Sequence, residues 1–146
     1  MRRIGVGVVV MGLVFATAPA VAAQAKPRQV GQPSSTITLV TGDQVVLQGG
    51  EPKSVRPGPG REGMRFSVQK TADHLYVIPA DAITAVGQGR VDRRLFDLRT
   101  LQEFGYDKRA TVPLIVTGQG ANRVATTGRA LPSIDGYAYD AAKGEA

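Results

Sequence analysis

Hydrophobic and polar residues alternate over short stretches of this chain, and turn-forming residues separate those stretches. Positions 36–40 alternate and are rich in β-branched residues, a turn occupies 41–44, and strand character returns at 45–47. The same pattern recurs at 65–69 and 75–78, with turn residues between the two runs. A period of two, broken by a turn, is typical of paired antiparallel strands, so each pair of runs predicts a β-hairpin.

Proline and glycine mark where the other strands begin and end. They crowd the segment 51–63, which predicts a loop with room for a short strand at 54–56. Residues 111–117 carry the strongest single strand pattern. Pro113 within that run favours an edge position or a strand start, because proline has no amide hydrogen to give to a neighbouring strand.

Two short helices complete the predicted elements. One covers 82–86 and ends at Gly87, and the other covers 101–104, with Thr100 as its N-cap and Gly105 just beyond its end. These elements together predict the α+β class: mostly short antiparallel strands and hairpins with two short helices, after a cleavable signal helix.

The pattern divides the chain into four parts. Residues 1–25 predict a signal peptide, 26–35 a flexible polar leader, and 36–117 an α+β domain. From 118 to 146 glycine is frequent and apolar residues are sparse, so we expect an incomplete, loosely ordered C-terminal segment.

The N-terminal end shows the three-part pattern of a secretory signal peptide. Two arginines follow the first methionine, an apolar run covers 4–15, and small residues dominate 16–25. The apolar run is shorter than the roughly 20 residues that a membrane-spanning helix needs, so we expect cleavage and no stable membrane anchor.

Small side chains at the third and first positions before the cut are what signal peptidase accepts. Ala23 and Ala25 meet this requirement and predict cleavage before Lys26, with 20–22 as a second possible site. The sequence therefore predicts a secreted, extracellular protein.

Charge and composition narrow the function of the exported part. The net charge of +6 falls to +4 when Arg2 and Arg3 leave with the signal peptide. Arginines are interleaved with acids and aromatic residues are few, which argues against a nucleic-acid-binding protein. There is no cysteine, so the exported domain folds without disulfides and has no thiol chemistry.

The sequence offers little catalytic chemistry. The single histidine, His74, follows Asp73 in a predicted turn, and adjacent side chains on an extended chain point apart, so we interpret His74 as a turn residue. No serine lies in a Gly-x-Ser-x-Gly elbow, and no cluster of metal ligands occurs at usable spacing. We therefore expect no catalytic residues, no cofactor and no metal site in this chain.

Two motifs have functional and structural interpretations. Residues 58–63 match Gly-x-Gly-x-x-Gly, but a strand pattern follows them where a dinucleotide site needs a helix, so we interpret them as a loop. Arg93-Arg94 could be a processing site. Because Asp92 and Asp97 flank the pair and can form local ion pairs, we favour an ordinary surface segment.

Several segments, in order and spacing, resemble the N-terminal region of large secreted subtilisin-like serine peptidases (subtilases) of high-GC bacteria. The similarity extends over most of the predicted mature chain, from Thr36 to Gly136. The segments that carry it are 36–45, 76–82, 89–98, 105–107, 112–116 and 131–136.

This resemblance implies a role on the prosegment side of a peptidase precursor. In that family the catalytic Asp, His and Ser blocks lie far downstream, and none of them occurs here, so no catalytic residue carries over. The implied partner is a cognate subtilisin-like catalytic domain, in cis or in trans, whose folding or latency the prosegment assists. The chain stops at Ala146, partway through the N-terminal region of that family, so we expect a truncated or partial precursor.

A second hypothesis needs no protease. The positive charge and the absence of a catalytic site also suit a free-standing secreted binding module that contacts anionic cell-surface polymers through the arginine-rich stretch 90–99.

Overall fold

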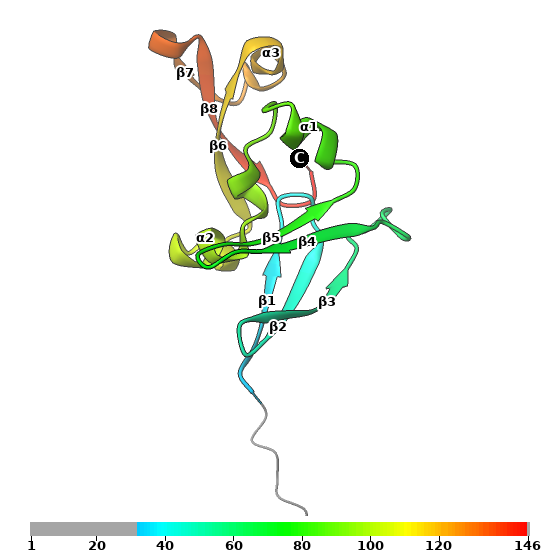
Figure 1. Ribbon diagram of the computed structural model, residues 1–146. Helices are drawn as coiled ribbons and strands as arrows, with labels where there is room; N and C mark the ends of the chain where they lie inside the picture. The colour runs from blue at the N-terminus through cyan, green and yellow to red at the C-terminus, as the bar shows by residue number, and fades with distance from the viewer. Residues whose placement is uncertain (1–31, 146) are drawn as a thin grey trace, which may run out of the picture. The chain divides into compact units, whose positions relative to one another are not determined.

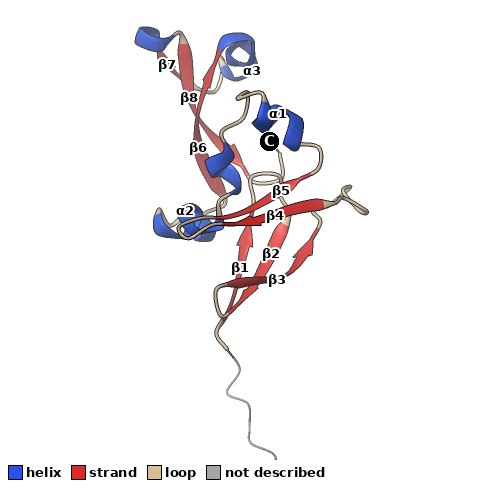
Figure 2. Ribbon diagram, viewed as in Figure 1, coloured by secondary structure: helices blue, strands red, loops and turns tan. Residues whose placement is uncertain are grey.

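The computed structural model describes residues 32–145 (Figure 1). The predicted signal peptide and its cleavage-site residues Ala23, Ala25 and Lys26 lie outside the described residues, as does most of the predicted leader. The described strands form three small antiparallel sheets joined by short helices, as the predicted α+β class requires (Figure 2). In this part of the chain no helix has both the length and the apolar character needed to cross a membrane.

The first sheet, sheet A, contains β1 (Ser34–Thr38), β2 (Gln44–Gln48) and β3 (Glu51–Arg56) in that order. The predicted first hairpin is confirmed as β1 and β2. The strand expected at 54–56 is longer than predicted and begins before Pro52. Pro52 lies opposite Leu47 beside a register shift, and β3 is an edge strand, where a missing amide hydrogen is tolerated.

The second sheet, sheet B, is the hairpin of β4 (Phe66–Lys70) and β5 (Leu75–Pro79), which confirms the second predicted hairpin. Every residue of β5 is buried, whereas β4 is half-buried or exposed. An isolated bridge joins Tyr76 to Asp97, so the chain after the hairpin folds back along β5.

Short helical segments connect sheet B to the next sheet. They are α1 (Ile83–Gly87), η1 (Arg93–Phe96), α2 (Leu98–Glu103) and η2 (Tyr106–Lys108), and α1 agrees with the predicted first helix. The predicted cap of α2 is wrong: Thr100 lies inside the helix, and Asp97 is the N-cap, its side chain accepting the amide hydrogen of Arg99. Aspartate caps as well as threonine does, and the earlier start brings Leu98 into the core.

The third sheet, sheet C, has the order β6-β8-β7 and is built from the last part of the chain. Its elements are β6 (Thr111–Thr117), η3 (Gly118–Gly120), α3 (Ala121–Val124), β7 (Arg129–Leu131), η4 (Pro132–Ile134) and β8 (Gly136–Ala142). The strand predicted at 111–117 and its edge position are confirmed.

The structure differs from the sequence-based expectation at β8. We expected loose order after residue 117, but β8 is the central strand of sheet C and pairs with β6 along its whole length. The strand pattern of β8 is weak in the sequence, because its apolar residues are alanines, which are small, and tyrosines, which carry a polar hydroxyl. Its order comes from the two neighbouring strands and from Ala141, which is buried in the core.

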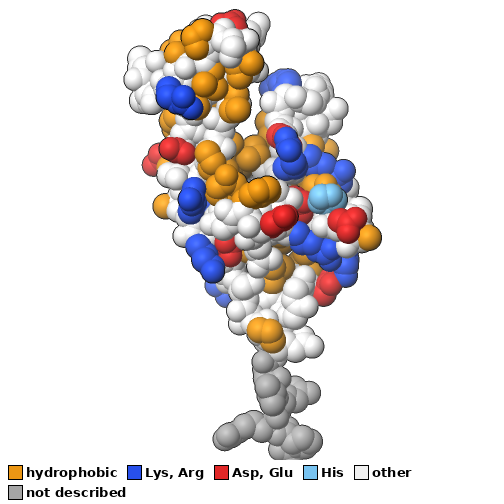
Figure 3. Space-filling model, turned by 90° about the vertical axis from the view of Figure 1, so that its left-hand side faces the viewer, with side chains coloured by type: hydrophobic (Ala, Val, Ile, Leu, Met, Phe, Trp, Pro, Cys, Tyr) orange, Lys and Arg blue, Asp and Glu red, His pale blue; other side chains and the backbone are white. Residues whose placement is uncertain are grey.

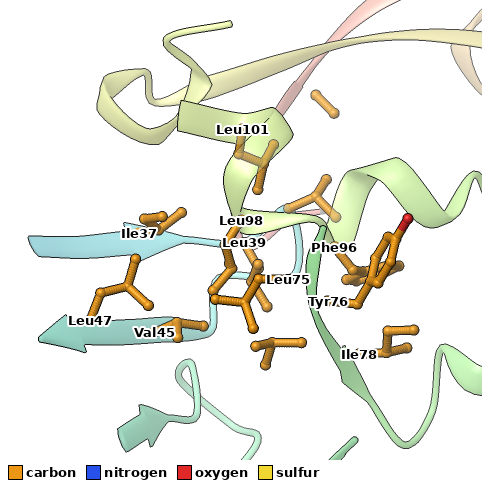
Figure 4. Packing of buried hydrophobic residues seen from close by; sticks show 13 residues of the cluster. Ile37, Leu39, Val45, Leu47, Leu75, Tyr76, Ile78, Phe96, Leu98 and Leu101 are labelled. Carbon is orange, nitrogen blue, oxygen red and sulfur yellow. The ribbon is translucent and has the colours of Figure 1, made fainter. Parts of the chain in front are cut away.

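One hydrophobic core connects the sheets (Figure 4). Phe96 and Leu98, on either side of the cap residue Asp97, pack among side chains from sheets A and B. The buried cluster contains Ile37, Leu39, Val40, Val45, Leu47, Leu75, Tyr76, Val77, Ile78, Phe96, Leu98, Leu101 and Ala141. Leu114 and Tyr139 of sheet C pack against it, so the end of sheet C that carries Ala141 belongs to the same core.

The turn between β1 and β2 holds the chain that follows β8. The amide of Gly144 donates a hydrogen bond to the carbonyl of Val40 at 2.9 Å. Gly42 has a φ of 84°, and a Cβ at this position would lie 2.8 Å from the Cα of Gly144. Glycine is therefore required at position 42 both for its backbone conformation and for this close approach.

Candidate functional site

Two charged side chains among the described residues are fully buried, Asp43 and Asp97. Burying a carboxylate costs free energy unless hydrogen bonds or an opposite charge compensate it. Each aspartate lies where segments distant in sequence meet, and the candidate site consists of these two residues and their partners.

Asp43 lies directly after the turn glycine of the β1–β2 hairpin. Its carboxylate accepts hydrogen bonds from the Thr41 hydroxyl at 2.6 Å, the Gly58 amide at 2.9 Å and the Arg61 Nε at 3.1 Å. The aspartate thus binds the loop that follows β3 to the first hairpin. The amide of Gly58 is used in this contact and does not serve a ligand.

Arg61 extends this contact to a third segment. Its Nη1 and Nη2 donate to the two carboxylate oxygens of Asp81 at 2.7 and 3.2 Å, in a bidentate pair. The hydrogen bonds that Arg61 donates to Asp81 and Asp43 raise the pKa of Arg61, and the guanidinium in turn lowers the pKa of Asp81. Arg61 therefore joins the β1–β2 turn to the chain just after β5.

Asp97 is compensated differently. It accepts the amides of Leu75 at 3.1 Å and Arg99 at 3.2 Å, and the Thr100 hydroxyl at 2.6 Å. Its Oδ2 also lies 2.6 Å from Nδ1 of His74. Burial opposes ionisation of Asp97, but the hydrogen bonds from Thr100, Leu75, His74 and Arg99 outweigh it and lower the pKa of the carboxyl.

The contact between His74 and Asp97 is the arrangement that a catalytic dyad would need, and sequence reasoning missed it because the residues lie far apart in the chain. The sequence-adjacent Asp73 takes no part in it. Within residues 32–145, however, no hydroxyl group is hydrogen-bonded to the imidazole, and the Thr100 hydroxyl is bound to Asp97. The arrangement positions the start of β5 against α2 and supplies no nucleophile.

The other predicted motifs have clear places in the fold. The glycine-rich residues 58–63 lead into β4 and not into a helix, as the sequence predicted. Arg93 and Arg94 lie in η1, where Asp92 caps the segment and forms an ion pair with Arg94 at 2.6 Å. The expected ion pair between Asp97 and this dibasic pair is wrong, because Asp97 caps α2 and contacts His74.

The surface around the histidine is basic. Figure 3 shows the histidine with groups of Lys and Arg side chains on either side of it. Arg93 lies over the ring of Tyr76, with its Cζ 3.8 Å from the ring centre, and His74 stacks on the same tyrosine at 5.5 Å between ring centres. The side chain of Arg99 donates to the carbonyl oxygen of Ala72 in the β4–β5 turn.

Among the described residues, the most exposed large apolar side chain is Ile115 of β6 in sheet C, with an exposed fraction of 66%. It borders a shallow hollow that Arg129 and Asp140 also line. This hollow is open to solvent and contains no grouped acid, base and nucleophile.

In the part of the chain that the structure describes, no three His, Asp or Glu side chains lie close enough together to hold a metal ion.

Comparison with known proteins places the chain in no group: no protein-family model, no curated protein and no solved structure matches it.

Proposed function

We propose that this chain is the N-terminal signal and prosegment part of a secreted subtilisin-like serine endopeptidase precursor, and that it assists the folding or the latency of the protease without being catalytic itself. The ordered resemblance over residues 36–136 motivates the proposal. The chemistry of the two buried aspartates is compatible with it, because their hydrogen bonds join segments of the fold and position no nucleophile.

The observation that carries the proposal is the open edge of β6. This strand is the longest edge strand of the three sheets, and it exposes Ile115 beside an unpaired backbone edge. A folding catalytic domain can use such a preformed edge and apolar surface as a template. The edge strand β1 of sheet A is shorter, with five residues against seven in β6. We therefore expect β6 to make the main contact.

Refolding of a subtilisin-like catalytic domain from the same genome tests this proposal. The denatured catalytic domain is diluted into buffer with and without the chain, and the recovered peptidase activity and its rate of appearance are measured. We expect the chain to raise the yield or the rate, because a prosegment lowers the kinetic barrier to folding without chemistry of its own. An unchanged yield, rate and final activity would refute the proposal.

A matched pair of variants locates the contact. Ile115→Lys places a charge on the β6 surface, whereas Val68→Lys places the same charge on β4, where Val68 is also half-exposed. We expect Ile115→Lys to abolish most of the effect on refolding and Val68→Lys to preserve it. Equal loss in both variants would show that β6 is not the docking strand.

A further inference from the structure

On the basic surface around η1, uncharged partners hold the side chains of Arg93 and Arg99 in place. We define the arginine surface as His74, Arg93, Arg94 and Arg99, which lie on the β4–β5 turn, η1 and the start of α2. Arg93 rests on the ring of Tyr76, and its Nη2 donates to the side chain of Gln69.

These contacts leave positive charge uncompensated. The partners of Arg93 are a tyrosine ring and an amide, and the partner of Arg99 is a backbone carbonyl, so neither guanidinium is neutralised by them. Arg94 differs, because Asp92 pairs with it. The nearby acid Asp97 is fully buried and its charge is spread over four hydrogen bonds, while Asp73 is an exposed acid in the turn.

The same contacts reduce the cost of binding an anion. An arginine that rests on an aromatic ring and donates to a fixed acceptor has already lost part of its rotamer freedom, so less is lost when a ligand arrives. The planar guanidinium also presents paired donors that match the oxygens of a phosphate group. Arg93 and Arg99 are therefore preorganised cations with donors to spare.

We propose that the arginine surface binds an extended polyanion with repeating phosphate groups, as found in anionic cell-envelope polymers. Among the described residues, the hollow around Arg61 and Met64 and the hollow beside Ile115 both lie away from this surface, which presents its arginines on open turns and short helices. A polymer gains affinity on an open surface because neighbouring phosphates engage neighbouring cations at high effective concentration. This inference rests on charge and packing around η1 and is independent of the proposed role in peptidase folding.

Binding of the full chain to long-chain inorganic polyphosphate tests the inference, by titration calorimetry at low and at moderate salt. We expect binding that weakens steeply as salt rises, because phosphate contacts release counterions. Arg93→Gln should lower the affinity about fivefold, since one arginine near an anionic surface contributes roughly 1 kcal/mol. Absence of binding at low salt would overturn the proposal.

Three comparisons make the test specific. Arg123→Gln removes an exposed arginine from α3, outside the arginine surface, and should leave the affinity almost unchanged. Equal losses in Arg93→Gln and Arg123→Gln would show a general charge effect and refute the site. Poly-glutamate of matched length should bind more weakly than polyphosphate, and equal binding would refute the preference for phosphate.

We expect Asp73→Asn to change the affinity for polyphosphate in the opposite direction from Arg93→Gln. The side chain is exposed and makes no hydrogen bond to another residue in 32–145, so its replacement should leave the fold intact and tighten binding several-fold by removing a repulsive charge. This variant also keeps the proposal falsifiable if Arg93→Gln lowers the melting temperature. Unchanged affinity of Asp73→Asn would contradict the assignment of this surface.

Discussion

The buried charges of Asp43 and Asp97 are compensated by different kinds of partner. Asp43 is compensated by a cation, because Arg61 contacts it directly and carries the charge outward to Asp81. Asp97 is compensated mainly by backbone amides and the Thr100 hydroxyl, and its one ionisable partner, His74, is half-exposed.

We call the contacts of Asp43 with Arg61 and Asp81 the first junction, and the contacts of Asp97 the second junction. The difference between them indicates which substitutions each junction tolerates. An ion pair that is only partly buried depends on keeping both partners, because removing one leaves the other charged and desolvated. A carboxylate held by several neutral donors depends instead on the acceptor, since its loss leaves all of those donors unpaired at once.

Removal of the acceptor at the second junction should have the largest effect. Asp97→Ala leaves the amides of Leu75 and Arg99 and the Thr100 hydroxyl without their acceptor, so we expect a loss of about 3–5 kcal/mol in the free energy of unfolding. Urea unfolding followed by circular dichroism measures it. Asp97→Asn keeps an acceptor oxygen and should lose less, and a loss below about 1 kcal/mol for Asp97→Ala would contradict the central role of this residue.

Removal of the cation at the first junction should come next. Arg61→Met preserves bulk but leaves the buried Asp43 without its counter-charge, and we expect a loss of roughly 2–3 kcal/mol because Arg61 itself is partly exposed. The control is Asp81→Asn, which removes the outer partner only. Asp81 is 46% exposed, so its loss should cost less than about 1 kcal/mol. Equal losses would show that the outer pair matters as much as the buried one.

The two turns of sheet A offer a matched pair of glycines, Gly42 beside Asp43 in the β1–β2 turn and Gly50 in the β2–β3 turn. Gly42 and Gly50 have φ values of 84° and 82°, but a Cβ on Gly50 would meet nothing within 4 Å, whereas one on Gly42 would meet the Gly144 backbone. Gly50→Ala should cost about 1 kcal/mol from the left-handed conformation alone. Gly42→Ala should cost about 1–2 kcal/mol more from the displaced chain. Equal melting temperatures for the two variants would show that the contact with Gly144 contributes nothing.

Acid should weaken both junctions. The pKa values of Asp81 and Asp97 are lowered in the folded protein, so the unfolded chain binds more protons in the same pH range and stability rises with pH there. The stabilisation is present above about pH 4–5 and is lost as the pH falls through the folded-state pKa values. Urea unfolding at pH 6 and pH 3 should show lower stability at pH 3, and Asp97→Asn should reduce the difference. A free energy of unfolding independent of pH would contradict this.

The smallest effect is expected at the exposed end of the second junction. His74→Phe keeps an aromatic ring on Tyr76 but removes the hydrogen bond to Asp97. Because the imidazole is half-exposed, we expect a loss below about 1 kcal/mol in thermal unfolding. A loss as large as that of Asp97→Ala would show that the histidine, and not the neutral donors, compensates the buried charge.

Much of the fold was predictable because its signals are local. Both hairpins, α1 and the edge strand β6 follow from alternation, turn residues and proline positions, which act within a few residues. The start of α2 was predicted three residues late, because Thr100 and Asp97 are both good capping residues and the core position of Leu98 decided between them. β8 was missed because its order depends on β6 and β7.

The candidate site was much less predictable. Nothing local distinguishes Asp43 and Asp97 from other aspartates in turns, and Arg61 lies in a loop that the sequence marks only by its glycines. A buried carboxylate is recognised by its full set of hydrogen-bond partners, and part of each set comes from residues 15 to 23 positions away in the sequence.

The sequence alone determined the sheet-forming segments, the lack of cysteine chemistry and the mixed-sign, arginine-rich composition, because each of these depends on residue type and near neighbours. The tertiary structure decided which acids are buried, which cations are left uncompensated around Tyr76, and that the last strand lies at the centre of sheet C. The physical reason is that burial and charge compensation are properties of contacts between distant segments, and those contacts exist only when the chain is folded.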